Sequence, residues 1–297
     1  MGVLKALDEA GIRPDVVCGS SIGALVGAVY AAGELERFAD WVQQLNMRKV
    51  FGFMDFNLAG GMLKGERLID FWRSNFVDFE IENSPMQFGA VATDLHSGAE
   101  VWMRQGSIAD AVRASIALPG LFTPVVREGR LLVDGGLVNP VPSSLARAMG
   151  ADIVIAVDLN ADLVQRHMRP MAVEQRTSVP DAPPEYVEAQ SADWISRLQT
   201  GLRGWLPGGG AGMGDAVDLV RVPSLLDVVM TSVNIMQMRI TRSRMAGDPP
   251  ELVIAARLAH LGLLDFHRAK EAMDEGYAAA QAALPGLQHF GWKARDL

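Results

Sequence analysis

A serine between small residues near the start of the chain is the first candidate for chemistry. Ser21 is the central residue of Gly19-Ser20-Ser21-Ile22-Gly23, which has the pattern of a nucleophile elbow. A sharp strand-to-helix turn makes a serine hydroxyl accessible, and Gly19 and Gly23 are expected to relieve the crowding in that turn. The backbone N–H of Ile22, at the start of the following helix, is the candidate donor to an oxyanion.

Two other interpretations of this motif stay open. A glycine-rich turn between a strand and a helix can serve packing alone, and the N-terminus of a helix can bind phosphate. No G-x-x-x-x-G-K-[ST] sequence occurs in the chain, and the glycine cluster at 208–214 has neither that lysine nor a preceding strand. The order of strand, motif and helix favours the nucleophile.

Asp134 is the candidate for the general base, because no histidine has a suitable setting. None of the histidines lies at a predicted strand end among small residues, and we expect surface or packing roles for His96, His167, His260, His267 and His289. Their spacing also disfavours a metal site. Asp134 follows a predicted strand and precedes Gly135 and Gly136, which would let the backbone turn and expose the carboxylate. Burial would raise its affinity for a proton, although an ordinary Asp-Gly turn is the other interpretation.

The segments that must position these residues alternate between strands and helices. Apolar runs predict strands at 14–18, 87–93, 100–104, 130–133, 152–157 and 252–255. Helical spacing predicts helices near 3–7 and at 21–32, 35–45, 67–76, 108–117, 143–149, 224–245 and 266–283. This alternation is typical of an α/β fold with a mostly parallel sheet.

The composition excludes several classes of protein. The chain has 297 residues, of which 49% are hydrophobic and 21% charged, so it can bury a sizeable core. A formal net charge of -8 disfavours a nucleic-acid binder, which would need a basic footprint. The one cysteine, Cys18, excludes an intramolecular disulfide.

We expect one domain over residues 1–297, with a flexible insertion at 160–220 where prolines and glycines accumulate.

A helical pattern inside the insertion predicts peripheral membrane contact. Its apolar face comprises Trp194, Ile195, Leu198, Leu202, Trp205 and Leu206. The other interpretation is a flap that packs on the protein or is disordered.

The start of the chain lacks the pattern of a secretory signal, and no apolar run approaches the ~20 residues of a membrane span. We therefore expect a cytoplasmic protein, with a peripheral position at the inner face of the membrane as the second expectation.

Several motifs together resemble one family, the bacterial patatin-like phospholipases related to neuropathy target esterase. They lie in the family's order at Gly2–Leu7, Gly19–Ala24, Ala92–Leu95, Arg113–Gly120 and Asp134–Pro142. The resemblance implies a three-layer α/β fold in which Ser21 attacks an ester, Asp134 accepts and returns its proton, and water hydrolyses the acyl-enzyme. It implies glycerophospholipid, lysophospholipid or simple lipid ester substrates and no metal or organic cofactor. The segment Arg113–Pro124 looks like the loop that flanks the family's active site, and we assign it a structural role.

The chain departs from the family pattern at its start. Members of the family begin with a strand and a loop, G-G-G-x-R-G, whose backbone amides form most of the oxyanion hole. The first residues here match the helix that follows this loop, so we expect a fold that lacks the usual first strand. The two open explanations are a start codon assigned too late and a truncated homologue.

The sequence as a whole predicts a serine acyl hydrolase with a Ser-Asp dyad, weakened by the missing oxyanion loop. A phospholipase, a lysophospholipase and a lipid esterase all fit this description. The alternative is a catalytically silent lipid-binding or regulatory homologue. Transfer of the acyl group to an acceptor other than water and the oligomeric state stay open.

Overall fold

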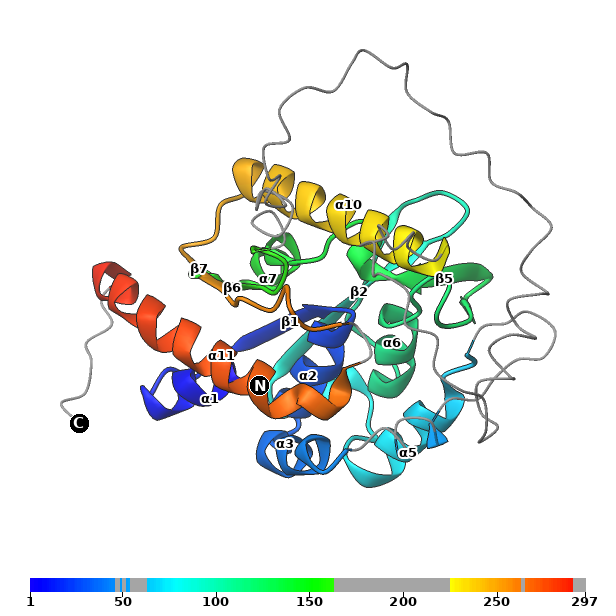
Figure 1. Cartoon of the computed structure of the whole chain (residues 1–297), viewed down its shortest axis with the longest axis horizontal. Coiled ribbons are helices and arrows are strands. Elements are labelled where there is room, and N and C mark those ends of the chain that lie inside the picture. Colours follow the sequence, from blue (N-terminus) through cyan, green and yellow to red (C-terminus); the bar gives the residue numbers. More distant parts are fainter. Residues whose placement is uncertain (46–48, 50–51, 54–62, 163–224, 263–264, 291–297) are drawn as a thin grey trace, which may run out of the picture. The chain divides into compact units, whose positions relative to one another are not determined.

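The computed structural model describes residues 1–45, 49, 52–53, 63–162, 225–262 and 265–290 (Figure 1). The predicted insertion at 160–220 lies outside these residues except for 160–162. The segment Trp194–Leu206, predicted to contact a membrane, lies wholly outside them.

The helices follow the predicted segments closely. They are α1 (Gly2–Glu9), α2 (Ile22–Ala31), α3 (Leu35–Gln43), α5 (Glu66–Asn75), α6 (Ile108–Ser115), α7 (Ser143–Ala148), α10 (Leu225–Gly247) and α11 (Ala269–Ala283). Short 3₁₀ turns are η1 (Ile81–Asn83), η2 (Gly135–Leu137), η3 (Phe266–Arg268) and η4 (Leu284–Phe290). Among the described residues, no helix combines the length and the apolar character needed to cross a membrane.

The strands form two sheets. One contains β1 (Val16–Ser20), β2 (Gln87–Asp94), β3 (Glu100–Met103), β4 (Val125–Arg127) and β5 (Arg130–Asp134), and the other pairs β6 (Ile155–Asp158) with β7 (Leu252–Ala255). The pairs β1–β2 and β6–β7 are parallel, whereas β2–β3, β2–β5 and β4–β5 are antiparallel. The fold is α/β as predicted, but the central sheet is mixed, so the prediction of a mostly parallel sheet was wrong.

Two hairpins account for two of the three antiparallel pairs, β2–β3 and β4–β5. Between β2 and β3, the Asp94 carboxylate accepts hydrogen bonds from the N–H groups of His96 (2.9 Å) and Ser97 (3.3 Å), which closes a tight turn. Between β4 and β5, Glu128 and Gly129 both have positive φ values, 51° and 73°, as a short turn between antiparallel strands often requires. Strands joined by such short turns can pair only in opposite directions.

Helices cover both faces of the central sheet, which makes a three-layer arrangement. Successive residues of a strand face opposite ways, and Phe88 and Gly89 of β2 illustrate this. A Cβ placed on Gly27 of α2 would lie 3.5 Å from the Phe88 ring, whereas one placed on Gly89 would lie 3.1 Å from Leu145 of α7. Figure 1 accordingly shows β1 and β2 between α2 and α6 on one side and α7 and α10 on the other.

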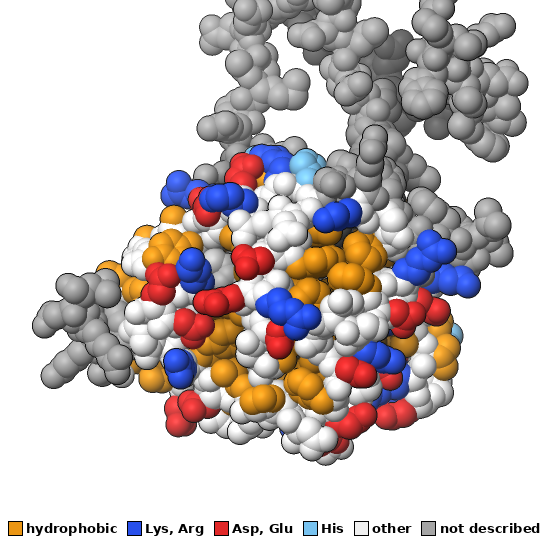
Figure 2. Space-filling model, turned by 90° about the horizontal axis from the view of Figure 1, so that it is seen from below, with side chains coloured by type: hydrophobic (Ala, Val, Ile, Leu, Met, Phe, Trp, Pro, Cys, Tyr) orange, Lys and Arg blue, Asp and Glu red, His pale blue; other side chains and the backbone are white. Residues whose placement is uncertain are grey.

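The largest core lies under α2 and α6. Phe88, Ala90 and Ala92 of β2 are buried there together with residues of α2, α3, α5 and α6. A second core joins α1 to α11 and β7, because Val3 and Leu7 of α1 pack with Ala280 of α11 and with Ile254 of β7. The view in Figure 2 shows acidic and basic side chains interspersed, with apolar side chains in separate patches between them.

Candidate active site

Strand β1, which ends one residue before Ser21, and strand β5, which ends at Asp134, meet end to end along one edge of β2. Parallel β1 pairs with residues 87–91, and its last residue, Ser20, lies opposite Val91. Antiparallel β5 pairs with residues 92–94, and its last residue, Asp134, lies opposite Ala92. Both strands lie on the side of β2 away from β3, because Ala90 and Ala92 each also pair with β3 on their other side. The sheet register therefore brings Ser21 and Asp134 together.

Ser21 has the backbone conformation of a sharp turn between β1 and α2. Its φ is 55° and its ψ is -127°, values that are strained for a residue with a side chain. Gly19 makes this turn possible, because a Cβ there would lie 2.3 Å from the Gly23 carbonyl. Gly23 itself has no such restriction, since a Cβ on it would meet no atom within 4 Å. The prediction that both glycines relieve crowding was therefore wrong for Gly23, whose own side-chain position is open.

The two side chains form a direct hydrogen bond. Ser21 Oγ donates to Asp134 Oδ2 at 2.6 Å, and the N–H of Gly136 donates to Asp134 Oδ1 at 2.7 Å. Gly135 must be small, because a Cβ there would lie 2.1 Å from the Val91 carbonyl oxygen. Gly136 is also confined, with Gln237 Nε2 of α10 at 2.5 Å from the position of its missing Cβ. The two hydrogen bonds thus hold the carboxylate, and the packing around Gly135 leaves no room for a side chain there.

Burial changes the proton affinity of Asp134. The residue is fully buried, and loss of hydration raises the pKa of its carboxyl group from 3.8 to about 6. The hydrogen bonds from Ser21 and Gly136 oppose this rise, because they stabilise the carboxylate. A carboxyl group with such a pKa is ionised at neutral pH and is a stronger base than an exposed aspartate.

Ile22 begins α2 directly after the nucleophile candidate. Its N–H belongs to the first turn of the helix, where backbone donors have no acceptor within the helix. No residue in the described part of the chain accepts a hydrogen bond from it.

A cavity of about 1000 Å³ adjoins Ser21, and apolar side chains make up most of its wall. The wall includes Ile22, Val26, Leu63, Leu118 and Phe122. The side chain of Ile22 is 43% exposed although it is apolar.

The segment that follows α6 forms one wall of this cavity, and Arg113 holds it in place. The buried Arg113 guanidinium donates to the carbonyl oxygen of Lys64 and, at 3.0 Å each, to the carbonyl and hydroxyl oxygens of Thr123. A β-bridge between Leu63 and Phe122 joins the same two segments. These contacts agree with the structural role predicted for the segment Arg113–Pro124.

The end of α6 contacts both members of the dyad, which the sequence analysis missed. The N–H of Ser21 donates to Ser115 Oγ at 2.9 Å, and the N–H of Asp134 donates to the carbonyl oxygen of Ala117 at 3.0 Å. The only sequence signal was the position of Ser115 within a motif of the family, between Arg113 and Pro119.

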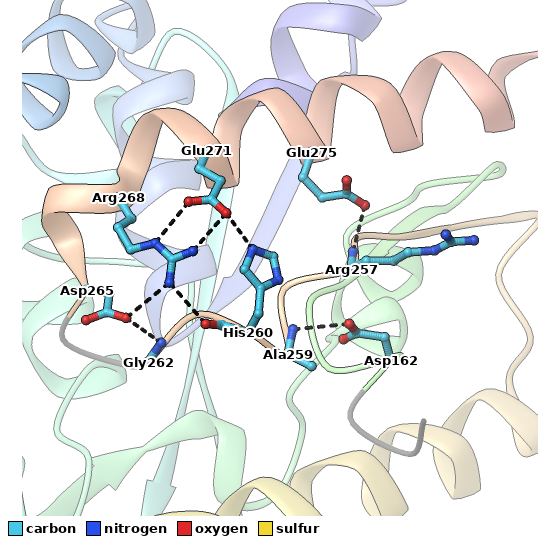
Figure 3. Close-up of polar contacts among 9 residues, drawn as sticks. All are labelled: Asp162, Arg257, Ala259, His260, Gly262, Asp265, Arg268, Glu271 and Glu275. Carbon is cyan, nitrogen blue, oxygen red and sulfur yellow. Dashed lines mark hydrogen bonds and ion pairs between the residues drawn. The ribbon is translucent and has the colours of Figure 1, made fainter. Parts of the chain in front are cut away.

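His260 lies in a separate polar cluster between the loop after β7 and α11 (Figure 3). Its Nε2 lies 2.8 Å from Glu271 Oε1, and Arg268 also bonds to that carboxylate. The hydrogen bond from His260, followed by that from Arg268, holds the pKa of Glu271 below its usual value. Neither His96, His260 nor His267, the histidines whose side chains the structure describes, contacts Ser21 or Asp134.

Two carboxylates in the same cluster accept hydrogen bonds from backbone N–H groups. Asp162 accepts a hydrogen bond from the N–H of Ala259 at 3.1 Å, and Glu275 accepts one from the N–H of Arg257 at 2.9 Å. Leu258 and Leu261 of this loop also line the cavity. The cluster therefore supports the cavity wall.

Comparison with known proteins gives one consistent result. The model of the family described as patatin-like phospholipase matches residues 1–147. An uncharacterized NTE family protein of Mycobacterium tuberculosis is 33% identical over an alignment covering 97% of this chain and 88% of that protein. The patatin-like phospholipase domain-containing protein 6 of Homo sapiens is 34% identical over 54% of this chain, which is 12% of that much longer protein. The family resemblance of the sequence is thereby confirmed, and the chain belongs to the patatin-like phospholipase family, with NTE family proteins among its relatives.

Proposed function

We propose that this protein is a lipid acyl hydrolase in which Ser21 is the nucleophile and Asp134 the general base. The observation that carries the proposal is the 2.6 Å hydrogen bond from Ser21 Oγ to the buried Asp134 carboxylate. A carboxylate with a pKa of about 6 can accept the hydroxyl proton at neutral pH and return it later. Membership of the patatin-like phospholipase family supports the same reaction class.

The first half of the proposed reaction forms an acyl-enzyme. Asp134 Oδ2 accepts the proton of Ser21 Oγ as this oxygen attacks the carbonyl carbon of the ester. The tetrahedral intermediate collapses when the bond to the alcohol oxygen breaks. The leaving alkoxide receives the proton from Asp134 and departs as an alcohol.

The second half regenerates the enzyme. Asp134 removes a proton from a water molecule, whose oxygen attacks the carbonyl carbon of the acyl-enzyme. The bond between this carbon and Ser21 Oγ then breaks, and Ser21 recovers its proton from Asp134. The products are a carboxylic acid and free enzyme, so the cycle needs no cofactor.

The apolar cavity supports a substrate with a hydrocarbon chain. Val26, Leu118 and Phe122 would contact an acyl group whose carbonyl carbon is next to Ser21. Each buried CH₂ group would contribute about 0.8 kcal/mol to binding. Lipid esters are therefore the proposed substrates.

The rate depends on how the oxyanion is stabilised. We propose the N–H of Ile22 as one donor, and loss of a donor lowers kcat by a factor of about 10² to 10³ in other hydrolases.

Among the described residues, β1 pairs only with β2 and β6 only with β7, and both strands line the cavity. These unpaired edges support the proposal of a sheet without the family's usual first strand.

Hydrolysis of p-nitrophenyl butyrate by the wild type and three variants tests the proposal. Ser21→Ala and Asp134→Asn are expected to lower kcat/KM by a factor of about 10³ or more. Ser20→Ala is the matched control, because Ser20 is the neighbouring serine and its hydroxyl has no hydrogen-bond partner among the described residues. It is expected to retain activity within about threefold.

Two results would contradict this function. Equal activity in the wild type and Ser21→Ala would exclude Ser21 as the nucleophile. A wild type that binds lipid vesicles but hydrolyses neither short-chain nor long-chain esters would instead establish the silent lipid-binding homologue.

A further inference from the structure

One short segment at the end of α6 is bonded to the backbone of both dyad residues. Ser115 Oγ accepts the N–H of Ser21 at 2.9 Å, and two residues later the carbonyl oxygen of Ala117 accepts the N–H of Asp134 at 3.0 Å. Ser115 and Ala117 are both fully buried. The segment 115–117 therefore holds the backbone of Ser21 and the backbone of Asp134 relative to each other.

The N–H of Ser21 depends on this contact because neither neighbouring element can satisfy it. The β1 ladder ends at Ser20, which pairs with Val91, and Ser21 precedes the first residue of α2. Ser21 also has a positive φ, a conformation that persists only when its surroundings hold it. Ser115 supplies a side-chain acceptor at this position.

We propose that Ser115 is a positioning residue, which holds the nucleophile in its strained conformation by accepting the Ser21 N–H. The proposal rests on the proposed function of Ser21, and it adds a residue that touches neither the ester nor the transferred proton. Without the Ser115 hydroxyl, the Ser21 backbone can relax, and Ser21 Oγ leaves the 2.6 Å contact with Asp134. Asp134 keeps its own bond to Ala117.

The helix α6 is a rigid support for this role. Its residues Ala109, Ala111, Val112 and Ala114 are fully buried. At its N-terminus the Ser107 hydroxyl accepts the N–H of Asp110 at 3.3 Å, which caps the helix. Ser107 and Ser115 thus occupy opposite ends of one helix, and only Ser115 contacts the dyad.

The matched pair Ser115→Ala and Ser107→Ala tests the proposal. Both variants remove one hydroxyl from α6, and Ser107→Ala weakens the helix without touching Ser21. Protein labelled with ¹⁵N-serine gives an amide signal for Ser21, which is assigned by its absence in Ser21→Ala. Loss of the acceptor in Ser115→Ala is expected to shift this signal and to raise its hydrogen-exchange rate at least about tenfold. Ser107→Ala is expected to leave both properties unchanged.

Kinetics give the second readout. Ser115→Ala is expected to lower kcat on p-nitrophenyl butyrate by a factor of about 10 to 100, with KM within about threefold, because misplacement affects the chemical step. Ser107→Ala is expected to keep the wild-type kcat. An unchanged Ser21 amide signal with wild-type kcat in Ser115→Ala would overturn the proposal, and so would an equal loss of kcat in both variants. If the wild type lacks esterase activity, the proposed function fails, whereas the amide signal still decides whether Ser115 holds Ser21.

Discussion

Ser20 and Asp134 lie opposite consecutive residues of β2, Val91 and Ala92, and they reach this edge from opposite directions. The separation of Ser21 from Asp134 is therefore set by backbone pairing before any side chain is considered. A one-residue slip of either strand would reverse which face its side chains point to and would separate the dyad. We expect substitutions at the glycines of this junction to differ in their effects on stability.

The two glycines of the nucleophile motif give the first prediction. Gly19→Ala is expected to lower the free energy of unfolding by about 3 kcal/mol or more, because the new Cβ would lie 2.3 Å from backbone atoms of Gly23. Gly23→Ala is expected to raise it by up to about 1 kcal/mol, because alanine favours the helix and meets no atom within 4 Å. Urea denaturation measures both values, and equal losses of stability in the two variants would contradict the described elbow.

The raised pKa of Asp134 gives a prediction about stability. Since the pKa rises from 3.8 to about 6 on folding, the folded state binds more protons than the unfolded state between these pH values. The contribution of Asp134 to the free energy of unfolding therefore falls as pH rises from about 4 to about 6 and stays low above that.

The variant Asp134→Asn removes this pH dependence and can keep hydrogen bonds to Ser21 and Gly136. We expect this variant to be about 1 to 3 kcal/mol more stable than the wild type at pH 7.5 and equally stable near pH 4. A variant less stable than the wild type at pH 7.5 would argue against burial as the cause.

The same group gives a prediction about activity. Asp134 must be ionised to accept the proton of Ser21, so kcat/KM is expected to rise with pH through about 6 and to level off above it. The profile should be measured with an ester that does not titrate in this range. A profile that is flat from pH 4.5 to 8 would exclude Asp134 as the base.

Much of the fold could be predicted because its signals are local. The strand before Ser21, the helix after it and the strand before Asp134 follow from apolar runs that end at glycines. The observed bounds differ from the predicted ones by a few residues, as helix caps and strand ends depend on their neighbours. The family motifs are also local, and they identified Ser21 and Asp134 as the candidate nucleophile and base.

The rest depended on contacts between distant segments. The three-residue strand β4 is too short to give a pattern, and its hairpin with β5 reverses the direction that strand alternation predicts. Ser115 lies 94 residues from Ser21 in the sequence, where it is only a small residue at the end of a helix. The Ala117 carbonyl carries no side-chain signal at all. Hydrogen bonds of this kind become visible only in the folded structure.

The buried Arg113 gives a prediction about the cavity wall. Arg113→Met leaves the carbonyl oxygens of Lys64 and Thr123 without this donor, so we expect the free energy of unfolding to fall by about 2 to 4 kcal/mol. The KM for long-chain esters should rise, because the wall that includes Phe122 loses its support. Arg73→Met is the control, since Arg73 forms ion pairs with the exposed carboxylates of Asp78 and Asp110 at the surface, and we expect a loss below about 1 kcal/mol. Equal losses in the two variants would show that Arg113 does not support the wall.

The most direct test of the Ser-Asp dyad is covalent labelling of the nucleophile. A fluorophosphonate reacts with an activated serine, and peptide mapping by mass spectrometry identifies the modified residue. We predict one adduct per chain, on Ser21, formed at least about 100-fold more slowly in Asp134→Asn and at an unchanged rate in Ser20→Ala. An adduct on another residue, or labelling of Ser21 at the same rate in Asp134→Asn, would contradict the dyad.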